Sequence, residues 1–310
     1  MNPKPLLFSS QSYAYLQARI LQHHPFETGK VEVKLFPDGE RYQRICCDVM
    51  DRDCILLGGT CSDSDTLELY DLACAIVKHG AKSLCLVVPY YGYSTMERAV
   101  HDGDVVTAKT RARLLSAIPQ AARGNHIALM DLHAGGVAHY FEGGIVTHHL
   151  FAKEVIVESC RSIGGKDFVL ASTDAGRAKW VESLANELRV DAAFVFKRRI
   201  DGSTTQLTAM NAKVEGKKVI IYDDMIRTGG SLLNAAEAYK QAGATEISAI
   251  ATHGVLPGEA LKKLTDSALF KHIMVTDTHP RALDLQAPGY EVISVARILS
   301  NWLAKKFQIN

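Results

Sequence analysis

Two neighbouring carboxylates and a glycine pair in VIIYDDMIRTGGS, residues 219–231, combine residue types that bind a phosphorylated sugar. Asp223 and Asp224 offer acceptor oxygens for the adjacent hydroxyls of a ribose, either directly or through a metal ion. Gly229 and Gly230 have no Cβ atoms, so a phosphate can approach the main chain closely. The segment therefore predicts a site for a ribose phosphate.

A strand and a helix must position these groups. The apolar run from Val219 to Tyr222 is typical of a buried parallel strand, and apolar side chains recur with helical period over residues 232–239. The helix is predicted to begin at Ser231. Its first N–H groups have no partner within the helix and carry a partial positive charge, which favours a bound phosphate.

The rest of the chain repeats this strand and helix pattern, which predicts an α/β fold with mainly parallel sheets flanked by helices. The apolar runs that indicate strands are at residues 54–57, 84–88, 127–130, 168–171, 193–196, 219–222, 247–251, 273–275 and 292–295. An amphipathic helix is expected over residues 296–307.

Residues 54–88 echo residues 218–252, because each segment reads as strand, polar loop, helix, Gly-Ala stop and strand. The echo indicates either an internal duplication or two ordinary βαβ units. Only the second segment carries Asp-Asp-x3-Thr-Gly-Gly; the first has Gly-Gly-Thr-Cys at residues 58–61. The sugar phosphate is therefore expected in the C-terminal half.

Composition excludes several classes of function. The 310 residues include 35 basic and 34 acidic side chains, and a formal charge of +1 gives no general attraction to nucleic acid or anionic membranes. No apolar stretch is long enough to span a bilayer, and no signal peptide is evident at the N-terminus. Seven cysteines without C-x-x-C spacing fit reduced thiols, so a cytoplasmic location is expected.

Further motifs point to one family. They are FPDGERY at 36–42, PYYGYSTMER at 89–98, MDLHAGGVAHYF at 130–141, STDAG at 172–176, FKRR at 196–199 and ATHGVLPG at 251–258. Together with residues 219–231, they make nearly the whole chain resemble the ribose-phosphate pyrophosphokinases, which synthesise phosphoribosyl pyrophosphate (PRPP) on a type I phosphoribosyltransferase fold.

The resemblance implies two related phosphoribosyltransferase-like domains, residues 1–147 on the nucleotide side and residues 148–310 on the ribose 5-phosphate side. The tail helix is expected to pack across the domains. The implied reaction moves a diphosphate from Mg-ATP to the 1-hydroxyl of ribose 5-phosphate, with Mg²⁺ as cofactor. The implied assembly is a homo-oligomer built from dimers, with a hexamer as one form.

The resemblance assigns roles to residues on the sugar side. The expected ribose 5-phosphate residues are Asp223, Asp224, Arg227, Thr228, Gly229, Gly230 and Ser231. Lys197 and Arg199 match the catalytic loop of the family, although a basic triplet can equally be a solvated loop. The polar residues 200–206 that follow are poorly suited to regular structure.

His133 and Asp174 follow predicted strands at the edge where α/β sheets bind ligands. The resemblance implies that His133 contacts magnesium nucleotide phosphates with a part in catalysis, and that Asp174 is a metal or ribose ligand. A structural histidine and an Asp that caps a helix near Gly176 are the alternatives. Because Mg²⁺ prefers oxygen ligands, His133 could instead donate to a phosphate.

The nucleotide residues are implied on the N-terminal half. Phe36 resembles an aromatic that stacks on adenine, with Asp38 and Glu40 nearby, commonly from a neighbouring subunit. The alternative is a simple turn after an apolar strand, as Phe-Pro-Asp-Gly suggests. Arg98 is also carried over to the nucleotide site.

Three positions depart from the family pattern. Thr95 and Met96 replace an Arg and a Gln that normally line the nucleotide site, which predicts a relaxed choice of nucleotide. Residues 99–106 form an acidic, shortened loop, which argues against phosphate and ADP regulation. Arg227 stands where an Asp is frequent. A catalytically silent regulatory homologue and a PRPP-consuming phosphoribosyltransferase are therefore the alternative functions.

Overall fold

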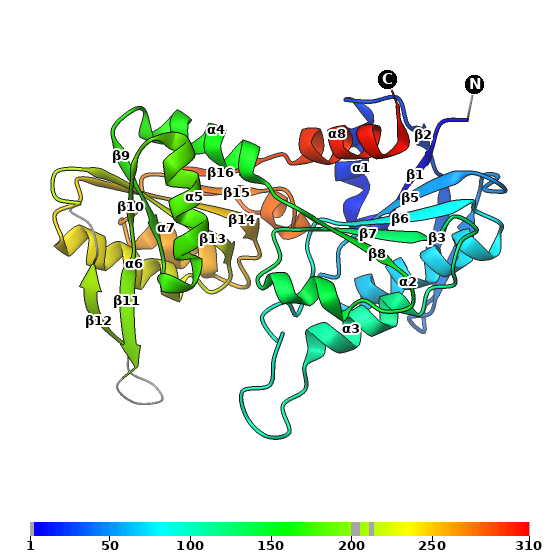
Figure 1. Ribbon diagram of the computed structural model, residues 1–310, viewed down its shortest axis with the longest axis horizontal. Coiled ribbons are helices and arrows are strands. Elements are labelled where there is room, and N and C mark those ends of the chain that lie inside the picture. The colour runs from blue at the N-terminus through cyan, green and yellow to red at the C-terminus, as the bar shows by residue number, and fades with distance from the viewer. Residues whose placement is uncertain (1–2, 200–204, 211–213, 310) are drawn as a thin grey trace. The chain divides into compact units, whose positions relative to one another are not determined.

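Two compact units make up the chain, as a computed structural model shows, and each contains a six-stranded parallel sheet. The structure describes residues 3–199, 205–210 and 214–309 (Figure 1). Unit 1 comprises residues 1–151 and 296–310, and unit 2 comprises residues 152–295. The division falls four residues beyond the boundary expected at 147, after strand β8 (Val146–Leu150) has completed the first sheet.

The sheet of unit 1 has the strand order β2-β1-β5-β6-β7-β8. Its other strands are β1 (Leu6–Ser9), β2 (Glu27–Thr28), β5 (Asp53–Leu57), β6 (Ser83–Val88) and β7 (Asn125–Met130). Alternate side chains of these strands, such as Leu56 and Leu86, pack in one core with helices α2 (Asp63–Lys78) and α3 (Thr107–Ser116). A short 3₁₀ turn, η2 (Gly135–Tyr140), follows β7.

The C-terminal helix α8 (Ala296–Phe307) has the predicted bounds but belongs to unit 1. It packs beside α1 (Ala14–Leu21), which follows the 3₁₀ turn η1 (Gln11–Tyr13). The hydroxyl of Ser300 donates to the main-chain oxygen of Ile20 at 3.1 Å. The expected C-terminal domain of residues 148–310 is therefore wrong in its last helix. Helix α8 belongs to unit 1, where its apolar face is buried.

Unit 1 also contains a separate two-stranded antiparallel hairpin, formed by β3 (Val31–Leu35) and β4 (Arg41–Ile45). The Phe36 N–H donates to the Glu40 oxygen at 2.8 Å, and Gly39 has a φ of +93° in the turn between the strands. The turn signal in Phe-Pro-Asp-Gly is thus confirmed.

The sheet of unit 2 has the order β10-β9-β13-β14-β15-β16, which repeats the pattern of unit 1. Its strands are β9 (Phe168–Ser172), β10 (Asp191–Ala193), β13 (Lys218–Ile226), β14 (Glu246–Gly254), β15 (Ile273–Thr276) and β16 (Tyr290–Ile293). Strand β13 pairs with both β9 and β14, so the carboxyl ends of these three strands meet at one edge.

Helices cover both faces of this sheet. Residues such as Ile221 and Ala249 share a core with α6 (Gly230–Gln241) and α7 (Ala260–Asp266). Helices α4 (Lys153–Gly164) and α5 (Ala178–Leu188) contact each other and the same sheet. A Cβ at Gly164 would lie 2.5 Å from the Phe168 ring and 2.9 Å from Ile220, so α4 needs a glycine to approach the strands. Short 3₁₀ turns, η3 (Ala175–Arg177) and η4 (Pro280–Asp284), follow β9 and β15.

The predicted strand at 193–196 is wrong in its bounds, because the chain changes sheets there. Ala193 ends β10, and Val195 begins β11 (Val195–Arg199), which pairs only with β12 (Thr205–Met210) among the described strands. The expectation of irregular structure over 200–206 is also wrong for its last two residues, Thr205 and Gln206, which lie in β12. Residues 200–204 lie outside the described part of the chain.

Candidate active site

The paired acids lie near the carboxyl end of β13, in the strand itself. The predicted run ended at Tyr222, but β13 continues to Ile226, so Asp223 and Asp224 are held by sheet pairing. Thr173, just after β9, donates its hydroxyl to Asp223 Oδ2 at 2.9 Å, and the Asp224 N–H donates to Asp223 Oδ1 at 2.9 Å. Pairing of β13 with β9 thus places the Asp223 carboxyl at the edge.

The two carboxyl groups have different surroundings. Asp224 is buried, and its Oδ2 lies 2.6 Å from Nη2 of Arg177 in η3. Asp223 is partly exposed, and burial together with the neighbouring Asp224 raises the pKa of Asp223 to about 7. At neutral pH Asp223 is therefore poised between an acceptor and a donor form.

The loop after β13 has one buried glycine, and most of the residues around it are exposed. Gly229 is buried with a φ of +78°, and a Cβ there would come 2.9 Å from Leu264 Cδ2. Arg227, Thr228 and Ser231 are exposed around it. Glycine is required at 229 both for the left-handed backbone and for packing on α7.

Helix α6 presents its N-terminus without a side-chain cap. Gly229 occupies the cap position, and the first turn, which includes Gly230 and Ser231, contains no acidic residue. The N–H groups at this end and the positive pole of the helix are therefore suited to a phosphate.

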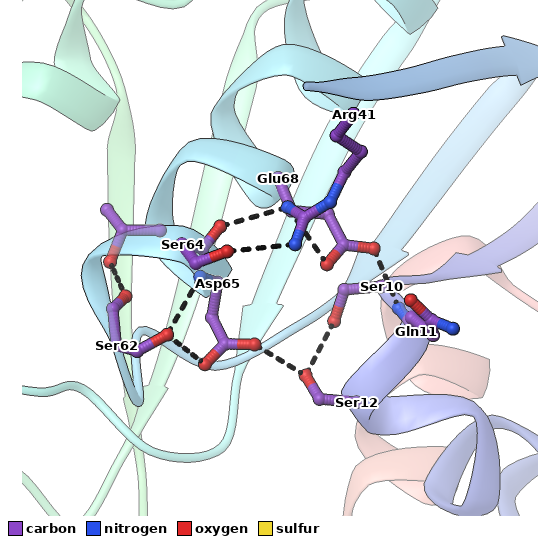
Figure 2. Close-up of polar contacts among 9 residues, drawn as sticks. Ser10, Gln11, Ser12, Arg41, Ser62, Ser64, Asp65 and Glu68 are labelled. Atoms are coloured by element: carbon purple, nitrogen blue, oxygen red, sulfur yellow. Dashed lines mark hydrogen bonds and ion pairs between the residues drawn. The ribbon is translucent and has the colours of Figure 1, made fainter. Parts of the chain in front are cut away.

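The equivalent helix of unit 1 is capped by its own side chains, as Figure 2 shows. Ser62 accepts from the Asp65 N–H at 3.0 Å, and the Asp65 carboxylate accepts from the hydroxyls of Ser62 and Ser12. Asp63 adds a second acid to this first turn. Two carboxylates at the N-terminus of α2 repel a phosphate, so the expectation that only the second copy holds the sugar phosphate has a physical reason.

Asp174 lies just beyond β9, in the same edge region as Thr173. Its Oδ1 accepts from the Gly176 N–H at 2.8 Å, which is the capping role considered as the alternative to a metal ligand. The Ser172 hydroxyl donates to the Asp174 main-chain oxygen at 2.5 Å. These bonds fix the residue while leaving Oδ2 for a further contact.

Lys197 and Arg199 lie in β11, whose backbone packs beside η3. Residue Arg177 of η3 forms the ion pair with Asp224 of β13. The strand with the predicted catalytic cations therefore lies next to the turn that supplies this partner of Asp224. Sequence reasoning did not identify Arg177 or Thr173 as part of this region. The signals were the position of both residues just after an apolar strand and the inclusion of Thr173 in the STDAG motif at 172–176.

His133 and the nucleotide residues all belong to unit 1. His133 is exposed after β7, and the preceding loop is held where the Leu132 N–H donates to His149 Nε2 at 3.1 Å. Phe36, Asp38 and Glu40 share the turn of the β3–β4 hairpin, where Asp38 Oδ1 accepts from the Glu40 N–H at 3.1 Å. Arg98 lies on a separate loop, 78% exposed, with its Nε 3.4 Å from Glu97 Oε1.

The hairpin is anchored to α2 by a buried acid. Arg41 Nη1 lies 3.4 Å from Oε2 of Glu68, which is 2% exposed, and Arg41 also donates to the main-chain oxygen and hydroxyl of Ser64 (Figure 2). The Gln11 N–H donates to Glu68 Oε1 at 2.9 Å. Arg41 directly follows Glu40, so this ion pair fixes the base of the candidate nucleotide turn.

The described residues contain no group of three His, Cys, Asp or Glu side chains that could hold a metal ion alone. Mg²⁺ is commonly held by one or two carboxylates with waters and substrate phosphates. A site with so few protein ligands therefore fits a metal that arrives with a nucleotide. Among the helices that the structure describes, none combines the length and the hydropathy of a membrane-spanning segment.

Comparison with known proteins identifies the family. Residues 6–118 match the N-terminal domain of ribose phosphate pyrophosphokinase, and residues 203–308 match the phosphoribosyl synthetase-associated domain. The ribose-phosphate pyrophosphokinase of Caldanaerobacter subterraneus is 32% identical over 297 residues, which cover 95% of this chain and 92% of that protein. The chain belongs to the ribose-phosphate pyrophosphokinase family.

Further comparisons extend this result to the fold. The Rhodopirellula baltica ribose-phosphate pyrophosphokinase is 32% identical over 95% of the chain. The crystal structure of phosphoribosylpyrophosphate synthetase from Mycobacterium smegmatis aligns with a TM-score of 0.87 and 25% identity, covering 98% of this chain and 99% of that one. The predicted α/β fold with two related parallel-sheet domains and the predicted family are both confirmed.

Proposed function

We propose that this protein is a ribose-phosphate diphosphokinase that converts Mg-ATP and ribose 5-phosphate into PRPP and AMP. The observation that carries the proposal is the carboxyl edge of unit 2, where the uncapped N-terminus of α6 lies next to Asp223 on β13. This pairing of a phosphate cradle with a carboxylate occurs in a chain that matches PRPP synthetases over nearly its full length.

The sugar would bind by its two kinds of polar group. Its 5-phosphate accepts from main-chain N–H groups of residues 228–231 and from the hydroxyls of Thr228 and Ser231, with Arg227 at the rim. Its ring hydroxyls donate to the ionised Asp223 carboxylate. Asp224 can accept from a second hydroxyl if Arg177 moves away from it or contacts it together with the sugar.

The reaction needs positioned charge rather than a protein nucleophile. The 1-hydroxyl oxygen attacks the β-phosphorus in line and loses its proton to water, a new P–O bond forms, and the bond from the β-phosphorus to the α–β bridging oxygen breaks so that AMP leaves with that oxygen. Lys197 and Arg199 are assigned to the negative charge on the migrating diphosphate, where positive charge stabilises the transition state more than the ground state.

His133 and Asp174 are assigned to the magnesium nucleotide. Asp174 would supply a carboxylate oxygen, and His133 would contact the nucleotide phosphates, as a hydrogen-bond donor where a direct bond to Mg²⁺ is disfavoured. When bound, Mg²⁺ would neutralise charge on the phosphate oxygens. Adenine is assigned to Phe36, with Asp38, Glu40 and Arg98 on the base, ribose or phosphates.

The exposed hairpin turn supports a nucleotide site shared between subunits. Phe36 is 37% exposed and Leu35 is 67% exposed, which leaves apolar surface at the turn for a neighbouring chain to cover. A homo-oligomer built from dimers is therefore part of the proposal. Its size can be measured by light scattering.

The test is to incubate purified protein with Mg-ATP and ribose 5-phosphate and to measure both products. Equal amounts of AMP and PRPP are expected, with none when either substrate is omitted. AMP formation without PRPP, or no turnover by protein that binds both substrates, would contradict the proposal. The second result would favour a silent regulatory homologue.

A further inference from the structure

A polar cavity lies at the amino edge of the sheet in unit 1, opposite the carboxyl edge that His133 follows. It has a volume of about 300 Å³, and it opens where β5, β6 and β7 begin and where α8 ends. Its lining residues are Asp53, Lys82, Ser83, Arg123, His126, Lys306, Phe307 and Gln308. All of them belong to unit 1.

This cavity is separate from the candidate active site. His126 is the second residue of β7, whereas His133 follows the carboxyl end of the same strand. At about 3.3 Å per residue, a strand of this length separates the two edges by roughly 20 Å. None of the residues assigned to the proposed reaction, in either unit, lines this cavity.

The lining carries an excess of positive charge. Lys82, Arg123 and Lys306 are cations, and Asp53 is the only acid among the lining residues. Asp53 already accepts from the Ser83 hydroxyl at 2.6 Å and lies 3.4 Å from Lys82 Nζ. The cavity therefore has a net charge of +2 with His126 neutral, and a concave positive surface attracts anions.

Two histidines report on this positive field. His126 Nδ1 lies 3.1 Å from His148 Nε2, and the His148 ring lies 5.2 Å from the ring of Trp302 in α8. Burial, with Lys306 and His148, lowers the pKa of His126 to about 4. Burial and Lys306 also lower the pKa of His148. Both rings are thus neutral at pH 7. The cations beside them outnumber the single carboxylate of the cavity, Asp53.

We propose that this cavity binds a small phosphorylated metabolite, with Lys82, Arg123 and Lys306 contacting the phosphate. The planar guanidinium of arginine matches phosphate oxygens, and lysine adds a mobile charge. The volume is at the lower end of ligand cavities, which suits one phosphate with a short carbon skeleton. Phe307 supplies an apolar wall for that skeleton.

The test uses the full chain and two probes at constant ionic strength. Inorganic phosphate and glycerol 3-phosphate are titrated into the protein while the imidazole signals of His126 and His148 are followed by NMR. Saturable shifts of these signals and a rise in the His126 pKa are expected, because a bound anion cancels the field of Lys306, Arg123 and Lys82 and adds to that of Asp53. Tighter binding of glycerol 3-phosphate would identify a phosphate ester as the ligand, and equal binding would identify free phosphate.

Charge variants decide whether the cavity is the site. Arg123→Gln and Lys306→Gln should each weaken binding by about tenfold or more, as expected for loss of a charge-assisted hydrogen bond. Lys305→Gln is the matched control, because Lys305 is the exposed neighbour on α8 and does not line the cavity. Arg123 is exposed, so its loss is compatible with folding. Unmoved histidine signals, or equal weakening by Lys305→Gln, would overturn the proposal.

Discussion

Arg177 Nη2 lies 2.6 Å from Asp224 Oδ2, and this pair joins the turn after β9 to β13, 47 residues further along the chain. The side chain of Asp224 is only 3% exposed, so this ion pair offsets part of the cost of burying its charge. The pair also leaves Asp223 as the accessible carboxyl at the sugar edge.

Arg177→Ala should destabilise the protein by about 3 kcal/mol, because it removes the ion pair of a buried carboxylate. Chemical denaturation measures the change in the free energy of unfolding. Arg161→Ala, which removes an exposed arginine of α4, should change it by less than about 0.5 kcal/mol. The double variant Arg177→Ala with Asp224→Asn should recover part of the loss. Equal destabilisation by the single and double variants would show that the pair is not the cause.

Asp223 should make both sugar binding and stability depend on pH. Its folded pKa of about 7 lies above the ordinary value of 3.8, so the folded state binds more protons than the unfolded state between about pH 4 and 7. The contribution of Asp223 to stability therefore falls as pH rises through this range. Asp223→Asn should raise the melting temperature at pH 8 more than at pH 4.

Ribose 5-phosphate affinity should change in the opposite direction, because the ionised carboxylate is the better acceptor. Calorimetry should show that the native protein binds ribose 5-phosphate more tightly as the pH rises from 6 to 8. Asp223→Asn should bind weakly and show only the pH dependence of the sugar phosphate itself. The same pH dependence in both proteins would contradict a role for Asp223.

Lys197→Ala should lower turnover by about 10²–10³-fold with little change in ribose 5-phosphate affinity, because Lys197 is assigned to the migrating diphosphate. Steady-state rates and calorimetry on the same variant separate these effects. Arg198→Ala, the neighbouring basic residue, is the matched control. Equal losses of affinity and turnover would remove the assignment.

Arg41→Ala should raise the KM for ATP several-fold while kcat changes little, because Arg41 and Glu68 fix the base of the turn that we propose binds the nucleotide and are not assigned to the reacting atoms. Arg44→Ala is the control on the same strand, since its partner Glu32 is exposed. A rise in KM of the same size for both variants would show that the hairpin position, and not the buried pair, sets the affinity.

The sequence predicts the βαβ units because buried parallel strands are strong apolar runs. The runs at 84–88 and 219–222 lie within β6 and β13, and α8 has the predicted bounds. The run at 193–196 fails because no local signal marks a change of sheet. Strands β1 and β4 were missed as elements, since a short strand or an exposed hairpin strand has little apolar pattern, whereas β3 was anticipated as the strand before the turn at Phe36.

The site shows the same limit. Asp223 and Gly229 could be predicted because their chemistry lies within one segment. Arg177, Thr173 and the Arg41–Glu68 pair could not, because their partners are distant in sequence and meet only through strand pairing and helix packing. Such positions require the tertiary structure.

A crystal structure of the protein soaked with ribose 5-phosphate tests the central proposal most directly. We predict the 5-phosphate within hydrogen-bond distance of the main-chain N–H groups of residues 228–231, with ring hydroxyls on the Asp223 carboxylate. A sugar bound away from the β13–α6 loop, or a phosphate pointing out of it, would contradict the account.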